Sequence, residues 1–238
     1  MSGHSKWATT KRRKDAVDSK RANAFTKLSH NISIAAKRGG DPEMNFSLFT
    51  AIEKAKSVNM PKDNIEKAVK RGTGELGGAI IEEVLYEGFG PGGIAILVEG
   101  VTDNKNRTTP EVRAILSKYG GSLGAQNSVK WMFEHKGVIH LQGDQIKDKD
   151  ELILELIDSG ADDVMEEDGG LTIYSGFANF EKIKKQLEQK SLKLAYAEME
   201  WVAKEKQSAS DEISEKIQNI VEILEEQDDI NSVYVNVD

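Results

Sequence analysis

The order of strand and helix patterns between residues 135 and 206 limits this chain more than any other feature of its sequence. Short aliphatic runs predict strands, and apolar residues spaced three and four apart predict helices. The strands are expected at 138–141, 163–165, 171–174 and 195–202, and the helices around Leu152, Leu156 and Ile157 and around Phe180, Ile183 and Leu187. This β-α-β-β-α-β order is typical of a ferredoxin-like α+β domain.

One helix and one strand remain after that unit, and neither can bury its apolar face alone. The helical pattern covers 213–224, and the alternating strand follows at 233–237. The segment at 79–134 lacks one helix and one strand, so it is the expected partner. We therefore expect 135–206 to be inserted into a discontinuous α+β domain made of 79–134 plus 207–238.

The segment at 79–134 has its own pattern of strands and helix. Two strand-like runs, 84–86 and 94–98, flank a glycine-rich stretch and predict a hairpin. A polar loop then leads into a helix, for which Thr108 and Glu111 have the spacing of a capping box. The run at 129–133 predicts a further strand.

Three short amphipathic helices are expected in the first 72 residues, a pattern typical of a helical bundle. Their apolar residues are Phe25, Leu28, Ile32 and Ala35; then Leu48, Phe49, Ile52 and Ala55; then Ile65, Ala68 and Val69 between Pro61 and Gly72. The glycine-rich segment 73–78 is a flexible linker by composition. The fold class is therefore α+β multidomain, with an N-terminal helical bundle and two α+β domains.

Charge is distributed very unevenly along the chain. Residues 1–72 contain 16 Lys and Arg against 7 Asp and Glu, a net charge of +9, and the whole chain carries −8. The remaining 73–238 therefore carry −17. Such an asymmetry between two ends of one chain favours a polyanionic partner for the basic end. We interpret the bundle as a nucleic-acid contact and the rest as its acidic scaffold.

Clustered Lys and Arg side chains neutralise phosphates and release counterions, and an aromatic ring beside them can stack on an unpaired base. The candidate nucleic-acid-binding residues are Lys6, Trp7, Lys11, Arg12, Arg13, Lys14, Lys20, Arg21, Lys27 and Arg107. Arg107 lies at the entrance to a helix, where it could hold a phosphate or a carboxylate. The structural alternative for Arg107 is a turn residue that makes local bonds.

The sequence offers little for catalysis, cofactors or metals. There is no cysteine, and the four histidines are isolated. Two matches to G-x-G-x-x-G, at 72–77 and 88–93, do not have the strand before and helix after them that a dinucleotide site needs, because the first follows a helix and the second lies between two strand-like runs. The acidic run at 166–168 lies at a hairpin tip, where solvation explains it. We expect no enzymatic activity, no cofactor, no metal and no small-molecule substrate.

No apolar run approaches membrane-spanning length, and no apolar segment follows the basic start, so a cytoplasmic location is expected.

Five segments together resemble the YebC family, which includes the mitochondrial translational activator of cytochrome oxidase. They are residues 1–7, 59–65, 70–74, 86–93 and 102–108, in that order. Ser2 stands where alanine is common in the family. The resemblance implies three domains, no enzymatic activity and a role in regulating gene expression.

The resemblance leaves the ligand open, because both kinds of family member meet a phosphate backbone. The first hypothesis is a DNA-binding transcriptional regulator. The second is a ribosome-associated translation factor that binds ribosomal RNA and relieves stalls at proline-rich sequences. A third, from a different class, is an adaptor that uses its acidic domains to hold a protein partner. The sequence also leaves the oligomeric state open, a monomer included.

Overall fold

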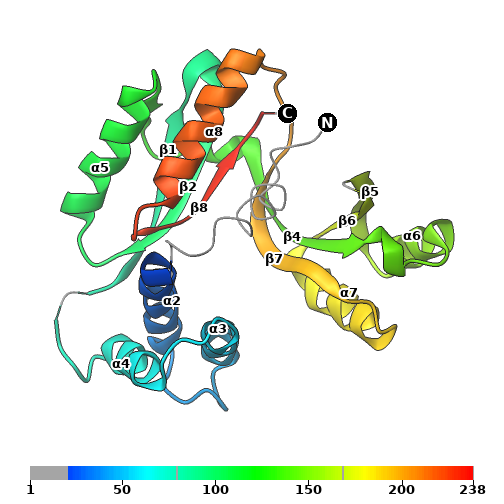
Figure 1. Ribbon diagram of the computed structural model, residues 1–238, viewed down its shortest axis with the longest axis horizontal. Coiled ribbons are helices and arrows are strands. Elements are labelled where there is room, and N and C mark those ends of the chain that lie inside the picture. The colour runs from blue at the N-terminus through cyan, green and yellow to red at the C-terminus, as the bar shows by residue number, and fades with distance from the viewer. Residues whose placement is uncertain (1–20, 79, 168, 238) are drawn as a thin grey trace.

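The computed structural model describes residues 21–78, 80–167 and 169–237. Figure 1 shows a group of helices, α2 to α4, and two separate sheets with helices packed on them. One sheet has the strand order β3-β1-β2-β8 and the other has the order β5-β6-β4-β7. This arrangement confirms the predicted α+β fold class with an N-terminal helical bundle.

The bundle consists of α2 (Arg21–Ala36), α3 (Phe46–Ser57) and α4 (Lys62–Gly72). Its core is formed by the predicted apolar residues with Ala36 and Met60 added, and its fully buried members include Ile32, Leu48 and Ala55. Phe49 is the exception, because its side chain is 48% exposed. Leu48, Ile52 and Ala55 already form the buried stripe at three- and four-residue spacing, and Phe49 lies one position off that stripe.

The sheet of the middle domain begins with a hairpin of β1 (Glu82–Phe89) and β2 (Ala95–Thr102), as predicted. The turn contains the 3-10 helix η2 (Pro91–Gly93), in which Gly92 and Gly93 both have positive φ. The short strand β3 (Ser122–Leu123) pairs with β1 at one edge of the sheet. Strand β8 (Ile230–Val235) pairs with β2 at the other edge.

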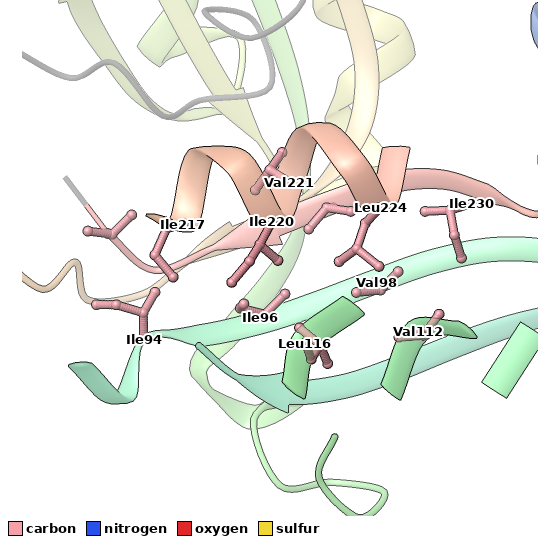
Figure 2. Close-up of a cluster of buried hydrophobic side chains, with 12 residues drawn as sticks. Ile94, Ile96, Val98, Val112, Leu116, Ile217, Ile220, Val221, Leu224 and Ile230 are labelled. Atoms are coloured by element: carbon pink, nitrogen blue, oxygen red, sulfur yellow. The ribbon is translucent and has the colours of Figure 1, made fainter. Parts of the chain in front are cut away.

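Helices α5 (Lys105–Lys118) and α8 (Asp211–Glu225) pack on one face of this sheet. Figure 2 shows the core between them, in which Ile96 and Val98 of β2 meet Leu116 of α5 and Ile220 of α8. All four side chains are almost completely buried. The C-terminal helix and strand thus complete the layer that the segment at 79–134 begins, and the second α+β domain is inserted between them.

The inserted domain contains six main elements in the order β-α-β-β-α-β. They are β4 (Phe133–Gln142), α6 (Lys149–Asp158), β5 (Ala161–Glu167), β6 (Gly170–Ser175), α7 (Phe177–Gln189) and β7 (Leu194–Ala203), with the 3-10 helix η4 (Gly143–Gln145) after β4. Every neighbouring pair is antiparallel, and β4 and β6 lie at the centre. The predicted ferredoxin-like arrangement is confirmed, while the residue boundaries of the domains stay predictions.

Two local predictions are wrong. The predicted strand at 129–133 does not form, because Lys130–Met132 are the 3-10 helix η3 and only Phe133 belongs to a strand, as the first residue of β4. The carboxylate of Glu87 accepts hydrogen bonds from the backbone N–H groups of Asn127, Val129 and Lys130, at 2.7 to 2.8 Å. Because these groups are bonded to a side chain, they cannot pair with a neighbouring strand.

The second wrong prediction is the capping box at Thr108 and Glu111. Helix α5 begins three residues before Thr108, and its N-cap is Asn104, whose side chain accepts from the N–H of Arg107 at 3.2 Å. The hydroxyl of Thr108 instead donates to Asp229.

The bundle rests on the middle domain through contacts made by α2 and by the residue that follows it. The side-chain amide of Asn231 donates to that of Asn31 at 2.9 Å. Lys37 Nζ donates to the backbone carbonyl of Ile81, just after the glycine-rich linker. Between the two sheets lies a further apolar cluster that includes Leu97, Phe133 and Tyr234.

Candidate nucleic-acid interface

Most of the predicted contact residues lie outside the part of the chain that the structure describes. They are Lys6, Trp7, Lys11, Arg12, Arg13, Lys14 and Lys20. Arg21 is the first residue of α2, and only its backbone is described. Their predicted role stays a prediction.

Lys27 is half-buried at the boundary between the bundle and the middle domain. Its Nζ donates to the backbone carbonyl of Glu225, the last residue of α8. A cation at this position satisfies a carbonyl that the helix leaves open and complements the negative end of the helix dipole. The structure therefore gives Lys27 a role in joining the domains, and a phosphate contact would have to replace this bond.

Arg107 holds a carboxylate in the structure, which is one of the two ligands proposed for it. Its Nη2 lies 2.8 Å from Asp229 Oδ2 and 3.2 Å from Asp103 Oδ1. Asp229 is 4% exposed and also accepts the hydroxyl protons of Thr102 and Thr108. Burial alone would raise the pKa of Asp229, but the hydrogen bonds from Arg107, Thr108 and Thr102 outweigh it and leave this pKa below its ordinary value. The Arg107 guanidinium is thus committed to a protein carboxylate.

Four other cations gather where α2 and α4 end. Lys37 and Arg38 follow α2, and Lys70 and Arg71 lie in the last turn of α4. All four residues are exposed, and we call them the basic corner.

Two close approaches bring these helix ends together. A Cβ added at Gly72 would lie 2.7 Å from the Cβ of Ala36, and one added at Gly40 would lie 2.7 Å from Thr73 Cγ2. Among the described residues, no acidic side chain forms an ion pair with Arg38, Lys70 or Arg71. The sequence alone does not place Lys37 and Arg38 beside the end of α4, because that pairing depends on how the helices cross.

Beside the basic corner, the loop between α2 and α3 carries large exposed apolar side chains. Met44 is 86% exposed and Phe46 is 69% exposed. Asn45 between them is buried, and its amide nitrogen donates to the carbonyls of Ala35 and Gly39, both at 2.8 Å. The sequence analysis missed this loop. The available signal was that Met44 and Phe46 flank a good N-cap residue and fall outside the apolar stripe of α3.

A cleft of about 780 Å³ lies between the bundle and the two sheets. The bundle side contributes Lys37 and Arg38, while the sheet side contributes the carboxylates of Glu82, Glu83 and Glu99. A phosphate backbone that entered this cleft would meet those carboxylates at close range. The outward face of the basic corner is therefore the better surface for a polyanion.

The structure offers little for metal binding or membrane insertion. Within 21–78, 80–167 and 169–237, no group of three or more His, Asp or Glu side chains is placed to hold a metal ion. The same residues include no helix with the length and apolar character needed to cross a bilayer.

Two family models match the chain. One, described as the TACO1/YebC protein N-terminal domain, matches residues 5–75. The other, described as the TACO1/YebC second and third domain, matches residues 81–237. The two matches divide the sequence at the linker.

Curated relatives match over the full length. A probable transcriptional regulatory protein of Thermoanaerobacter pseudethanolicus is 48% identical, over 100% of this chain and 97% of its own. Another of the same name, from Dictyoglomus thermophilum, is 48% identical over 100% of this chain and 96% of its own. The crystal structure of a conserved hypothetical protein from Aquifex aeolicus superposes with a TM-score of 0.82 at 39% identity, covering 93% of this chain and 92% of that one.

Proposed function

The chain belongs to the TACO1/YebC family, and we propose that it is a non-enzymatic regulator of gene expression that binds DNA through its basic bundle. Its relatives carry the name probable transcriptional regulatory protein, which supports a regulatory role in general. We place this role in the cytoplasm.

The observation that carries the proposal is the basic corner. Arg38, Lys70 and Arg71 are exposed on one side of the bundle, where α2 and α4 end. Mobile counterions leave a polyanion when such cations bind it, which favours association at low salt. Residues 73–238, which include both α+β domains, carry a net charge of −17 and would be repelled from the same polymer, so they restrict contact to the bundle.

A ribosomal RNA ligand is the second candidate, and one observation favours it. Phe46 is an exposed ring next to the basic corner, and sequence-specific RNA recognition commonly uses unpaired bases stacked on such rings. In that case the protein acts as a translation factor on the ribosome, with the same cations on the phosphate backbone.

Charge reversal at the basic corner tests the proposal. The triple variant Arg38→Glu, Lys70→Glu, Arg71→Glu should weaken duplex DNA binding at least about tenfold at low salt. It should also make the plot of log K against log salt concentration less steep, since each lost phosphate contact removes a slope of about 0.9. The matched control reverses three exposed lysines of the inserted domain, Lys147, Lys185 and Lys193.

Equal loss in the two triple variants would show that the location of the charge does not matter and would contradict the proposal. Crosslinking in cells, followed by sequencing of attached DNA and RNA together, separates the two ligands. Enrichment of promoter DNA supports the regulator, and enrichment of ribosomal RNA supports the translation factor.

A further inference from the structure

The loop between α2 and α3 exposes apolar surface that a folded protein normally covers. Met44 and Phe46 are 86% and 69% exposed, and Phe49 one turn further along α3 is 48% exposed. Exposed apolar groups gathered on one segment mark interaction sites far more often than isolated ones do.

A local structural role does not account for this exposure. Met44 and Phe49 occupy the positions before the N-cap and four residues after it, where a hydrophobic staple would close over the helix start. A closed staple buries both side chains, but here both remain largely in contact with solvent.

The backbone under these side chains is held firmly. Asn45 Oδ1 accepts from the N–H of Leu48 at 3.2 Å and caps α3, while Asn45 Nδ2 bonds two carbonyls, those of Ala35 and Gly39. The N–H of Met44 donates to the carbonyl of Asp41 at 3.2 Å. The apolar side chains are therefore presented from a fixed backbone, which lowers the entropy cost of binding.

Asn45 also joins the apolar loop to a cation. Its hydrogen bond to the Gly39 carbonyl ties the residue after Arg38 to the residue before Phe46. An exposed guanidinium and an exposed ring consequently flank a single hydrogen bond. A phosphate beside a displaced base needs this pairing of groups.

We propose that Phe46, with Met44 beside it, is a stacking site for one unpaired base of a nucleic acid whose neighbouring phosphate is held by Arg38. The inference rests on the proposed function and adds the kind of nucleic acid that the bundle recognises. Asp41 and Glu43 place two carboxylates on the same loop, which disfavours a continuous phosphate backbone there. A single extruded nucleotide avoids those carboxylates and still reaches both the ring and the guanidinium.

Phe177 provides a matched control within the same chain. It is 79% exposed and is the first residue of α7, just as Phe46 is the first residue of α3. However, its N-cap is Gly176, which makes no side-chain cap, and the basic residue that follows it, Lys182, donates from Nζ to the backbone carbonyl of Ser159 at 3.0 Å. The two phenylalanines thus share exposure and helix position but not the clamp or the cation.

The experiment measures binding of the full chain by fluorescence anisotropy at one fixed low salt concentration. The probes are a labelled 12-nucleotide single-stranded RNA, the single-stranded DNA of the same sequence, and the corresponding DNA duplex. Phe46→Ala should weaken binding to single strands by about tenfold or more, which is the range for loss of one stacked base, and should change duplex binding less than about twofold. Phe46→Trp should restore single-strand binding, and Phe177→Ala should leave all three affinities unchanged.

Each outcome separates this inference from the proposed function. If Phe46→Ala loses more affinity for single-stranded RNA than for single-stranded DNA, or the reverse, the difference identifies the nucleic acid that supplies the base. Equal losses show that the site does not distinguish the two sugars. Each of these three results supports the stacking site. If the wild-type protein binds nucleic acid but Phe46→Ala binds single strands within twofold of it, the stacking site is wrong and the exposed pair serves a protein contact. An equal loss with Phe177→Ala also overturns it. If the wild-type protein binds none of the probes, both the inference and the proposed function fail.

Discussion

Arg107 Nη2 donates to both carboxylate oxygens of Asp229, at 3.0 and 2.8 Å, although 122 positions separate the two residues. Arg107 lies in the first turn of α5, and Asp229 lies just before β8. The hydroxyls of Thr102 and Thr108 complete the set of donors around this buried carboxylate. The ion pair therefore joins the two separate segments of the middle domain on either side of the inserted one.

Replacing Asp229 should destabilise the middle domain. Asp229→Ala leaves Arg107 and two threonine hydroxyls without their acceptor, so the free energy of unfolding should fall by about 3 kcal/mol. Urea denaturation followed by circular dichroism measures the change. Asp103→Ala is the control, because Asp103 contacts the same guanidinium at 3.2 Å from a more exposed position and should cost less than about 1 kcal/mol. Equal costs would contradict the assigned role of Asp229.

The same carboxylate should make the protein sensitive to acid. The pKa of Asp229 in the folded protein lies below its ordinary value of 3.8, because hydrogen bonds from Arg107, Thr108 and Thr102 outweigh the opposing effect of burial. The unfolded chain therefore binds the proton more readily, so the stabilisation is complete above the ordinary pKa and disappears as the pH falls through the lowered one. Urea midpoints measured from pH 7 down to pH 3 should decline below about pH 5. The decline should be shallower in Asp229→Asn, and parallel curves would contradict this assignment.

Local apolar periodicity made the larger part of the fold predictable. Ile183 and Leu187 mark α7 because helix spacing and burial coincide there, and the same holds for Val112 and Leu116 in α5. The order of such elements was sufficient to predict the ferredoxin-like domain and its insertion.

Long-range side-chain bonds made the other elements unpredictable. The carboxylate of Glu87 accepts a hydrogen bond from the backbone N–H of Val129, 42 residues away, and so prevents the strand that the apolar pattern favours. Asp229 accepts a hydrogen bond from the hydroxyl of Thr108, and Asn104 is the residue that caps α5. The positive charge of the bundle was likewise readable from sequence. Its arrangement into a corner beside Phe46 was not, because it depends on how α2 and α4 cross.

Glu87 should be needed for the conformation of the segment after β3. Glu87→Gln places an amide NH₂ group among three backbone donors, so at least one bond is lost and the free energy of unfolding should fall by about 2 kcal/mol. Hydrogen exchange at the amides of Asn127, Val129 and Lys130 should accelerate selectively. The control, Glu83→Gln, changes an exposed carboxylate on the same strand and should leave those rates unchanged. If the two variants exchange alike, Glu87 does not hold this segment.

Gly72 should tolerate no side chain, because α2 and α4 approach each other closely there. An added Cβ would lie 2.2 Å from the carbonyl oxygen of Ser33, so Gly72→Ala must push α4 away from α2 and should cost about 2 kcal/mol or more. Gly74→Ala has open space around its Cβ and only the strain of a positive φ, with an expected cost of about 1 kcal/mol. Thermal unfolding of both variants compares the costs. Gly72→Ala should also weaken duplex DNA binding, because it separates Arg38 from Lys70 and Arg71. Wild-type affinity in this variant would show that DNA binding does not depend on the distance between these cations.

Asn45 should matter for binding as well as for stability, because it both caps α3 and fixes the loop that carries Phe46. Asn45→Ala removes both functions and should lower the free energy of unfolding by about 2 kcal/mol. Asn45→Asp separates them, since a carboxylate still accepts from Leu48 but cannot donate to the carbonyls of Ala35 and Gly39.

We expect Asn45→Asp to keep the helix content measured by circular dichroism and to lose about fivefold or more in affinity for single-stranded RNA or DNA, since stacking is worth roughly 1–3 kcal/mol per base and needs a fixed ring. The new negative charge in Asn45→Asp itself repels phosphate. Glu43→Gln measures the size of that effect, because it removes one negative charge from the same loop without changing the hydrogen bonds of Asn45. The affinity lost in Asn45→Asp must therefore exceed the affinity gained in Glu43→Gln. Wild-type affinity in Asn45→Asp would mean that Phe46 binds without a rigid support, and the clamp would then be a device for helix capping alone.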